Sequence, residues 1–372
     1  MKKGWQIKTL GDICVIKTGK KDVNQGNPNG RFPFFTCAKE HTFSDSFSFD
    51  TEALLIAGNG DVGNVSYYNG KFEAYQRTYV LSGFENILPK FLFQILDGSL
   101  KASMSNQKLG NTMPYIKLGM LKEFEIPLPP LPEQQRIIAI LDKAFTSITQ
   151  AKANTEQNLR NIQELFDNYL HDIFNNKSNG WEIRKLSEVA EYFNGLTYSP
   201  KDVGDTGIIV LRSSNVQNNQ LDFSDIVRVN KIVKDKIIVK DGDILMCSRN
   251  GSKKLVGKTA TIKNLKEEMT FGTFMMIIRG RHNPYLSWFF KSNNFRRQIS
   301  GGENTMINQI TRYMLDDVVV SFPPIEIENG IVNELDILSG KIEKMKIVYQ
   351  KKLDNLDDLK RSILAKAFAG KL

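Results

Sequence analysis

The chain has 372 residues, and 41% of them are hydrophobic, which is enough for folded cores and too much for a disordered chain. At about 150 residues per domain, this length predicts two or three domains. Three cysteines and three histidines, with no CxxC, HxxxH or HExxH spacing, argue against a disulfide framework and a structural zinc site. The apolar runs are too short to span a membrane and no apolar stretch follows the first lysines, so we expect a cytoplasmic protein with reduced thiols.

The formal charge of +9 is unevenly distributed along the chain. Residues 1–130 carry a net +3 (15 basic, 12 acidic), 131–174 carry −2 (4 and 6), 175–320 carry +7 (22 and 15) and 321–372 carry +1 (9 and 8). Two basic blocks separated by a nearly neutral segment favour a polyanionic partner, although a solvated surface also accounts for a modest excess.

The chain contains an internal duplication. Four segments recur in the same order: 4–10 (GWQIKTL) as 180–186 (GWEIRKL), 89–93 as 284–288, 111–113 as 304–306, and 116–130 as 310–324. The separation is 176 residues at the first match and 195 at the second, so the second half has about 19 extra residues between positions 180 and 284. The pattern predicts two related domains.

Each half begins with strand-like stretches and continues into a helix. The strand-like stretches, separated by glycine and asparagine turns, are 53–57, 74–81, 208–211, 243–247 and 274–278. Pro89 and Pro284 are placed as in the first turn of a helix. Prolines at 127–132 and at 323–324 then end each domain, which indicates a mixed α/β (α+β) class for both.

A long helix follows each proline segment. Apolar residues recur every three or four positions at Ile137, Leu141, Phe145, Ile148, Leu159, Ile162, Phe166, Tyr169 and Ile173, with Lys152 and Thr155 as polar interruptions, and at Ile331, Leu335, Leu338, Ile342, Met345, Tyr349, Lys352, Leu356, Leu359 and Ile363. The order along the chain requires the helices to run antiparallel if these seams pack together, with the domains at opposite ends. We therefore predict four segments: a domain at 1–130, a coiled-coil helix at 131–174, a domain at 175–324 and a second coiled-coil helix at 325–372.

No catalytic or metal motif is supported by the sequence. Residues 251–259 resemble a phosphate-binding loop, but five residues separate the two glycines where that motif has four. Asn283-Pro284-Tyr285 lacks one proline of the aminomethyltransferase NPPY motif, and no glycine-rich cofactor loop precedes it. We expect a non-catalytic chain that binds no metal or cofactor.

Loops that combine basic and amide side chains are the candidates for DNA contact. Arginine suits guanine, asparagine and glutamine suit adenine, and lysine suits phosphates. The candidates are Lys20, Lys21, Arg31, Asn59, Gln76, Arg77, Lys108 and Asn111 in the first half, and Arg212, Asn215, Arg249, Asn250, Lys253, Lys254, Arg296 and Arg297 in the second.

The whole chain resembles the specificity subunit of type I restriction–modification systems. The resemblance is carried by the run PLPPLPEQQR at 127–136, by Gly-Trp at the start of each half, and by residues 212–216 and 239–245. One departure lies in the second proline segment, where residues 327–329 (IEN) stand opposite residues 133–135 (EQQ).

The resemblance implies that each domain recognises one half of an interrupted double-stranded DNA site. It implies that two methyltransferase subunits, which carry S-adenosylmethionine, dock on the central helices, and that motor-nuclease subunits, which use ATP and Mg, join for cleavage. The candidates for partner contact are Pro129, Pro130, Glu133, Gln134, Gln135 and Arg136. The alternatives are a coiled-coil scaffold that binds proteins, and the specificity arm of another restriction–modification class.

The heptad pattern predicts that the helices set the spacer between the half-sites. Seven residues inserted after Thr155 and at the facing point of the second helix keep the seam in register and lengthen both helices by roughly 10 Å. That length corresponds to about three base pairs, which also rotate one half-site relative to the other by roughly 100°. We expect methylation of the original spacer to fail while the half-site bases stay the same, as measured on a library of spacer lengths. Full activity on the original spacer would contradict this.

Overall fold

The computed structural model describes residues 4–105, 115–175, 180–300 and 308–372. The chain forms two compact units, one of residues Met1–Glu156 with Tyr349–Leu372 and the other of residues Gln157–Val348. Each unit therefore contains one half of the duplication together with one end of each long helix. Among the described residues, no helix is both long and apolar enough to cross a membrane.

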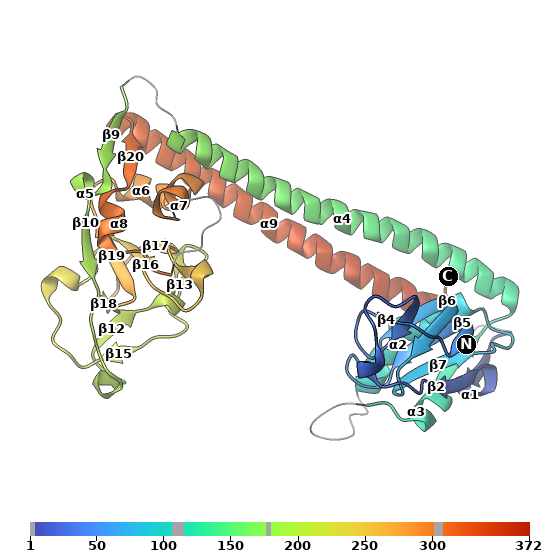
Figure 1. Cartoon of the computed structure of the whole chain (residues 1–372). Helices are drawn as coiled ribbons and strands as arrows, with labels where there is room; N and C mark the ends of the chain where they lie inside the picture. The colour runs from blue at the N-terminus through green and yellow to red at the C-terminus, as the bar shows by residue number, and fades with distance from the viewer. Residues whose placement is uncertain (1–3, 106–114, 176–179, 301–307) are drawn as a thin grey trace. The chain divides into compact units, whose positions relative to one another are not determined.

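The first unit is built around a six-stranded sheet (Figure 1). Its elements are β1 (Gln6–Thr9), α1 (Leu10–Ile13), β2 (Val15–Thr18), η1 (Val23–Gln25), β3 (Phe32–Phe35), β4 (Thr42–Ser44), β5 (Phe49–Ala57), β6 (Val65–Ala74), β7 (Thr78–Ser82), α2 (Pro89–Ser105), α3 (Leu118–Lys122) and β8 (Glu125–Leu128). The order in the sheet is β2-β7-β5-β6-β3-β4, and β1 pairs separately with β8.

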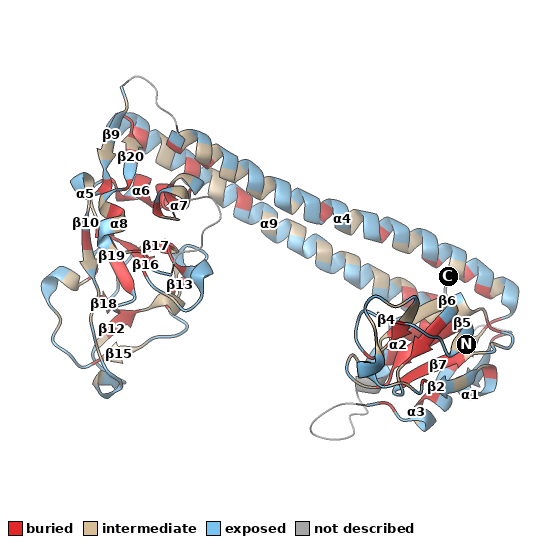
Figure 2. Ribbon diagram, in the orientation of Figure 1, coloured by how far each residue is buried: buried red, intermediate tan, exposed pale blue. Residues whose placement is uncertain are grey.

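The central strand β5 is buried on both faces: side chains alternate along a strand, and the two sets of β5 pack into different cores. Leu54 and Ile56 of β5 belong to the core that α2 and the ends of the long helices cover. Ala53 and Leu55 belong to a second core, with Phe35. The buried strands contrast with the exposed outer faces of the helices (Figure 2).

The second unit has smaller sheets and more elements. They are β9 (Glu182–Lys185), α5 (Leu186–Val189), β10 (Glu191–Asn194), η2 (Pro200–Asp202), β11 (Val203–Gly204), β12 (Ile208–Leu211), η3 (Ser213–Asn215), β13 (Val216–Gln217), β14 (Gln220–Leu221), β15 (Arg228–Val229), η4 (Asp235–Ile237), β16 (Ile244–Cys247), η5 (Lys253–Leu255), β17 (Thr259–Thr261), β18 (Met269–Phe271), β19 (Met275–Arg279), α6 (Asn283–Phe289), α7 (Asn293–Ser300), α8 (Arg312–Asp316) and β20 (Val319–Phe322). Two four-stranded sheets have the orders β10-β19-β16-β17 and β11-β15-β12-β18.

The duplication predicted from sequence is confirmed at the level of strand pairing. The order β2-β7-β5-β6 in the first unit recurs as β10-β19-β16-β17 in the second, and the pair β1-β8 recurs as β9-β20. The parallel pairing of β3 with β6 likewise recurs as β12 with β18. The hairpin β13-β14 and η4 lie between β12 and β16, within the region where the second half has its extra residues.

One predicted strand is two strands in the structure. The stretch 74–81 consists of the end of β6, a turn at 75–77, and the start of β7. The N–H of Thr78 donates to the carbonyl oxygen of Tyr75 (2.8 Å), which closes this turn. An unbroken strand was the wrong prediction here, because period-two patterning does not reveal a reversal between two apolar runs.

The two long helices, α4 (Leu131–Asn175) and α9 (Ile325–Phe368), pack together. In the first unit, Ile137 and Leu141 of α4 share a core with Leu364 and Ala367 of α9. In the second unit, residues from the other end of α4 share a core with Leu335. The start of each helix thus lies with the end of the other, as an antiparallel pair requires.

The polar interruptions of the first seam have partners. Thr155 is buried and its hydroxyl donates to the carbonyl oxygen of Ala151 (2.7 Å), while Lys152 forms an ion pair with Asp357. In the second seam, Met345 and Leu359 are 42% and 47% exposed, and Lys352 is also exposed. Those three seam positions were wrong. At each of these three places the residue one position later is half-buried instead: Lys346, Leu353 and Lys360. The Lys360 ammonium lies 5.2 Å from the centre of the Phe145 ring.

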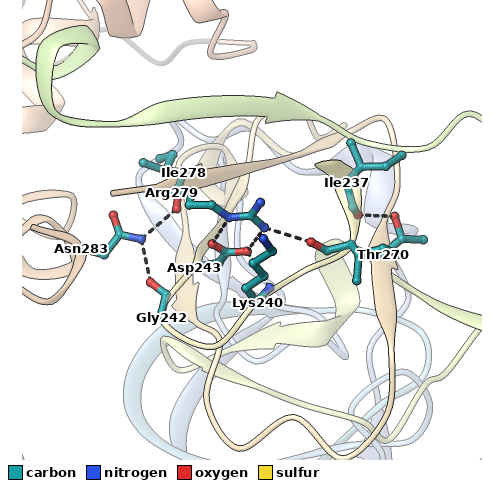
Figure 3. Close-up of polar contacts among 9 residues, drawn as sticks. Ile237, Lys240, Gly242, Asp243, Thr270, Ile278, Arg279 and Asn283 are labelled. Carbon is teal, nitrogen blue, oxygen red and sulfur yellow. Dashed lines mark hydrogen bonds and ion pairs between the residues drawn. The ribbon is translucent and has the colours of Figure 1, made fainter. Parts of the chain in front are cut away.

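The segment 239–245 contains a turn at 241–242 and the start of β16, and its polar contacts hold the second unit together (Figure 3). The carboxylate of Asp243 is 2% exposed and accepts two hydrogen bonds from Arg279 (2.7 and 2.6 Å) and one from the N–H of Lys240 (2.7 Å). The bonds to Asp243 raise the pKa of Arg279. The amide of Asn283 donates to the carbonyl oxygens of Gly242 and Ile278, and so connects this turn to the start of α6.

The start of α4 is attached to its domain by a buried glutamine. The side chain of Gln134 accepts from the N–H of Leu88 (2.7 Å) and donates to the carbonyl oxygens of Asn86 (3.0 Å) and Pro129 (2.8 Å). The equivalent residue in the second half is Glu328, whose carboxylate bonds to His282 (2.7 Å) just before α6. The departure between the two proline segments therefore reflects a change of buried partner at this position.

Replacing Gln134 with alanine should destabilise the first unit, because three backbone groups lose their partners in a buried place. We expect the free energy of unfolding to fall by roughly 2 to 4 kcal/mol. Urea denaturation followed by circular dichroism measures this. The matched control is Gln135→Ala, since the neighbouring side chain is exposed and should change stability by less than about 0.5 kcal/mol. Equal effects of the two changes would contradict the anchoring role.

Candidate nucleic-acid interface

In the first unit, two loops and the chain before α3 are joined by backbone hydrogen bonds. The N–H of Gly58 donates to the carbonyl oxygen of Arg77 (3.0 Å), and the N–H of Ile116 donates to the carbonyl oxygen of Gly58 (2.9 Å). These bonds bring Asn59, at the end of β5, next to the turn that carries Gln76 and Arg77. Both Gln76 and Arg77 are exposed, and Asn59 is half-buried.

Lys21 connects a further loop to the same place. Its carbonyl oxygen accepts from the N–H of Gln76 (3.0 Å). Its ammonium group donates to Ser44 (2.9 Å) and Ser46 (2.6 Å) and lies 3.4 Å from the buried carboxylate of Glu73. Lys21 therefore stabilises the loop, whereas its neighbour Lys20 is exposed and carries an available positive charge.

Arg31 immediately precedes β3, whose first residue Phe32 pairs with Ser44, one of the serines that Lys21 contacts. Its guanidinium lies 5.8 Å from the centre of the Phe32 ring, and the residue is exposed. The structure thus groups Lys20, Asn59, Gln76 and Arg77 around Lys21 and adds Arg31 beside β4. Lys108 and Asn111 lie outside the described residues.

The second unit repeats the same backbone arrangement. The carbonyl oxygen of Phe274 accepts from the N–H of Ser248 (2.9 Å) and of Arg249 (3.1 Å), and the N–H of Ile310 donates to the carbonyl oxygen of Ser248 (2.7 Å). Ser248 therefore stands where Gly58 stands in the first unit, and Phe274 stands where Arg77 stands. Arg249 occupies the place of Asn59.

This arrangement borders a hollow of about 990 Å³ in the second unit. Its lining residues are Tyr198, Arg212, Ser213, Ser214, Arg249, Asn250, Gly251, Gly272, Thr273, Phe274, Met275 and Asn308. Among the described residues, this lining includes two arginines and no aspartate or glutamate. A concave surface with hydrogen-bond donors and positive charge suits an anionic partner.

Loop 212–216, one wall of this hollow, is held by the buried Asn215 and the half-buried Lys258. Asn215, 1% exposed, accepts from the N–H of Arg212 (2.8 Å) and donates to the carbonyl oxygens of Asp222 (2.9 Å) and Asp225 (2.8 Å). The ammonium of Lys258 donates to the carbonyl oxygen of Ser213 (2.5 Å), and burial lowers the pKa of this lysine. Asn215 thus supports the loop from within rather than pointing out of it.

The other basic candidates of the second unit lie in different surroundings. Arg296 donates to the carbonyl oxygen of Val256 (2.6 Å), and burial lowers its pKa. Arg297 bonds to His171 of α4 (3.1 Å). These two do not line the hollow, whereas Lys253 and Lys254 are exposed in η5, shortly after Asn250.

The candidates for partner contact divide into buried and exposed residues. Pro129 and Gln134 are buried, and Gln134 makes the anchoring bonds described above. Arg136 pairs with Glu133 (2.7 Å), which raises the pKa of the arginine, and also donates to the carbonyl oxygen of Leu372 (2.8 Å). Pro130 and Gln135 are exposed and available to a partner.

Reasoning from sequence missed Phe274, Tyr198, Ser213 and Asn308, which also line the hollow. Phe274 is 57% exposed although it lies next to a buried strand. A large apolar residue in a turn after glycine was an available signal, but it was assigned to the strand. The other three lie far from Phe274 in sequence, so only the folded chain brings them to the same hollow.

The chain is similar over nearly its whole length to specificity subunits of type I restriction enzymes. The chain is 27% identical over 412 aligned residues to the type I restriction enzyme EcoDI specificity subunit of Escherichia coli, covering 99% of this chain and 88% of the relative. It is 20% identical to the type I restriction enzyme MjaVIII specificity subunit of Methanocaldococcus jannaschii, covering 99% and 93%.

Solved structures share the fold. A chain from a structure concerned with complex assembly and conformational transition of the type I R-M system matches with a TM-score of 0.81 at 19% identity, covering 100% of this chain and 99% of that one. The HsdS subunit from Thermoanaerobacter tengcongensis matches with a TM-score of 0.61 at 18% identity, covering 100% and 98%.

The family model described as the type I restriction modification DNA specificity domain matches twice, at residues 2–160 and 178–351. The two matches coincide with the two halves that repeat the same strand order and the same backbone arrangement, and they cover most of the chain. This protein therefore belongs to the DNA specificity family of type I restriction–modification systems.

Proposed function

We propose that the chain recognises an interrupted double-stranded DNA site, with each half recognising one half-site. The observation that carries this is the shared backbone arrangement that presents different side chains in the two halves: Asn59 and Arg77 in one, Arg249 and Phe274 in the other. A constant frame that presents different side chains suits two different DNA sequences. The lining beside Arg249, which has no aspartate or glutamate among the described residues, and the basic charge of both halves support a DNA partner.

We propose further that this chain supplies specificity and assembly, and that chemistry belongs to its partners. Two methyltransferase subunits would bring S-adenosylmethionine, and motor-nuclease subunits would bring ATP and Mg. The support is the sequence, which has no complete phosphate loop and no cofactor loop before Asn283. We propose that the chain acts in the cytoplasm.

The exposed part of the first proline segment is our proposed docking point for a partner subunit. Pro130 and Gln135 are exposed, and Leu131 between them is 42% exposed. Because Pro129 and Gln134 are buried on the inner side, a partner can contact the outer side without disturbing the anchor of α4.

An exchange of domains tests the function. Residues 1–128 are replaced by the matching domain of a relative, so that β8 moves together with its partner β1. The methylome of a strain that expresses the chimaera with its methyltransferase should show one changed half-site and one unchanged half-site. A second chimaera also exchanges residues 349–372, because the end of α9 contributes to the core of the first unit.

The control is the purified chain without methyltransferase subunits, which should transfer no methyl group when S-adenosylmethionine is added. Changes in both half-sites, in chimaeras that assemble normally, would contradict recognition by separate domains. Methylation by the chain alone would contradict the division of labour.

Arg77→Ala and Arg249→Ala should each weaken recognition, at opposite half-sites. Loss of a two-pronged contact to a base costs roughly 1–3 kcal/mol and relaxes one base position, whereas loss of a phosphate contact weakens all sequences alike. Binding of the assembled methyltransferase complex to a panel of single-base variants measures the difference.

Lys254→Ala is the matched control for this pair, since Lys254 is an exposed cation close to Arg249 in sequence but outside the lining of the hollow. We expect it to weaken every site about equally and to reduce the salt dependence. If both arginine variants bind the whole panel as the unchanged chain does, these two loops do not contact DNA.

A further inference from the structure

In the part of the chain that the structure describes, no hydrogen bond or ion pair joins the guanidinium of Arg249 to another residue. Its backbone N–H donates to Phe274 (3.1 Å), and the residue forms a bridge with Gln309, so the main chain is fixed on two sides. Its side chain is exposed, and the guanidinium lies 5.6 Å from the centre of the Phe274 ring. A rigid backbone beneath an outward-pointing arginine is suited to recognition.

The nearby Arg212 shows the contrast. Its guanidinium bonds to the carboxylate of Asp225 (2.6 Å), which occupies donors and offsets the charge. An aromatic ring instead holds a guanidinium through its face and uses none of the N–H donors in its plane. Arg249 thus keeps its charge and its donors for a ligand.

We propose that Phe274 is a positioning residue for Arg249, and that Arg249, held by this ring, recognises a guanine in the half-site of the second domain. Guanine presents two acceptors in the major groove that match the two-pronged edge of arginine. This inference rests on the proposed function and names one base and one supporting residue within it.

The duplication supports the importance of this position. The backbone place of Phe274 is taken by Arg77 in the first unit, and the place of Arg249 by Asn59. The first half thus has an arginine, Arg77, in the turn before β7, whereas the second half has its arginine, Arg249, just after β16. Phe274, 57% exposed, lies where the first half has a side chain for contact.

The test uses the specificity chain assembled with its methyltransferase subunits and a panel of duplexes in which each base pair of the second domain's half-site is changed in turn. For Arg249→Ala, we expect discrimination at one G·C position to fall by about 5- to 100-fold. For Phe274→Leu, discrimination at the same position should fall by about 2- to 5-fold. Phe274→Tyr should keep the discrimination of the unchanged chain, because the aromatic ring face is retained.

The double variant separates positioning from direct contact. If Phe274 acts through Arg249, adding Phe274→Leu to Arg249→Ala should change nothing further at that position. A further loss in the double variant would show that Phe274 contacts DNA itself and would overturn the proposal. So would an effect at a position other than G·C, or an equal loss on all duplexes.

Phe223→Leu is the matched control, because Phe223 is an exposed phenylalanine of the same unit (42% exposed) that does not line the hollow. It should leave the panel unchanged. If the unchanged complex discriminates between bases but neither variant alters this, the inference alone fails. If the unchanged complex shows no preference at any position of this half-site, the proposed function fails as well.

Discussion

Two backbone hydrogen bonds that recur in both halves hold the loops on which the candidate DNA contacts depend. The bonds that join Gly58 to Arg77 and to Ile116 have direct counterparts at Ser248, Phe274 and Ile310. Because they involve only main-chain atoms, they place few demands on the side chains that the loops carry. Side chains at these positions can therefore differ between halves while the frame stays the same.

Different side chains on one frame produce different surfaces. In the first unit, the frame presents the amide of Asn59 and the guanidinium of Arg77. In the second unit, Arg249 takes the backbone position of Asn59, and its guanidinium lies over the Phe274 ring. Lys258 and Asn215 hold the loop that forms the other wall of the hollow. Their side chains bond to backbone carbonyl oxygens and are therefore already occupied.

Each long helix is likewise attached at an equivalent position in the two halves, but by a different side chain with different partners. Gln134 satisfies three backbone groups, whereas Glu328 bonds to a histidine side chain at the corresponding place. A glutamine and a glutamate have the same length, so each reaches the chain that precedes the domain's helix. The first segment leaves Pro130 and Gln135 exposed on its outer side, so the proposed docking point lies on the face opposite the anchor.

The sequence by itself determined the duplication, the mixed fold class and the antiparallel pair of long helices, because these depend on periodicity and order along the chain. It also named the loops with Arg77 and Arg249 as candidates for DNA contact, which stays a prediction. Only the tertiary structure showed that Met345 and Leu359 face outward, that Asn215 is buried in support of its loop, and that Phe274 faces the hollow. The reason is physical: a side chain's role depends on the neighbours it meets across the sheet and between distant segments, and local patterning does not encode them.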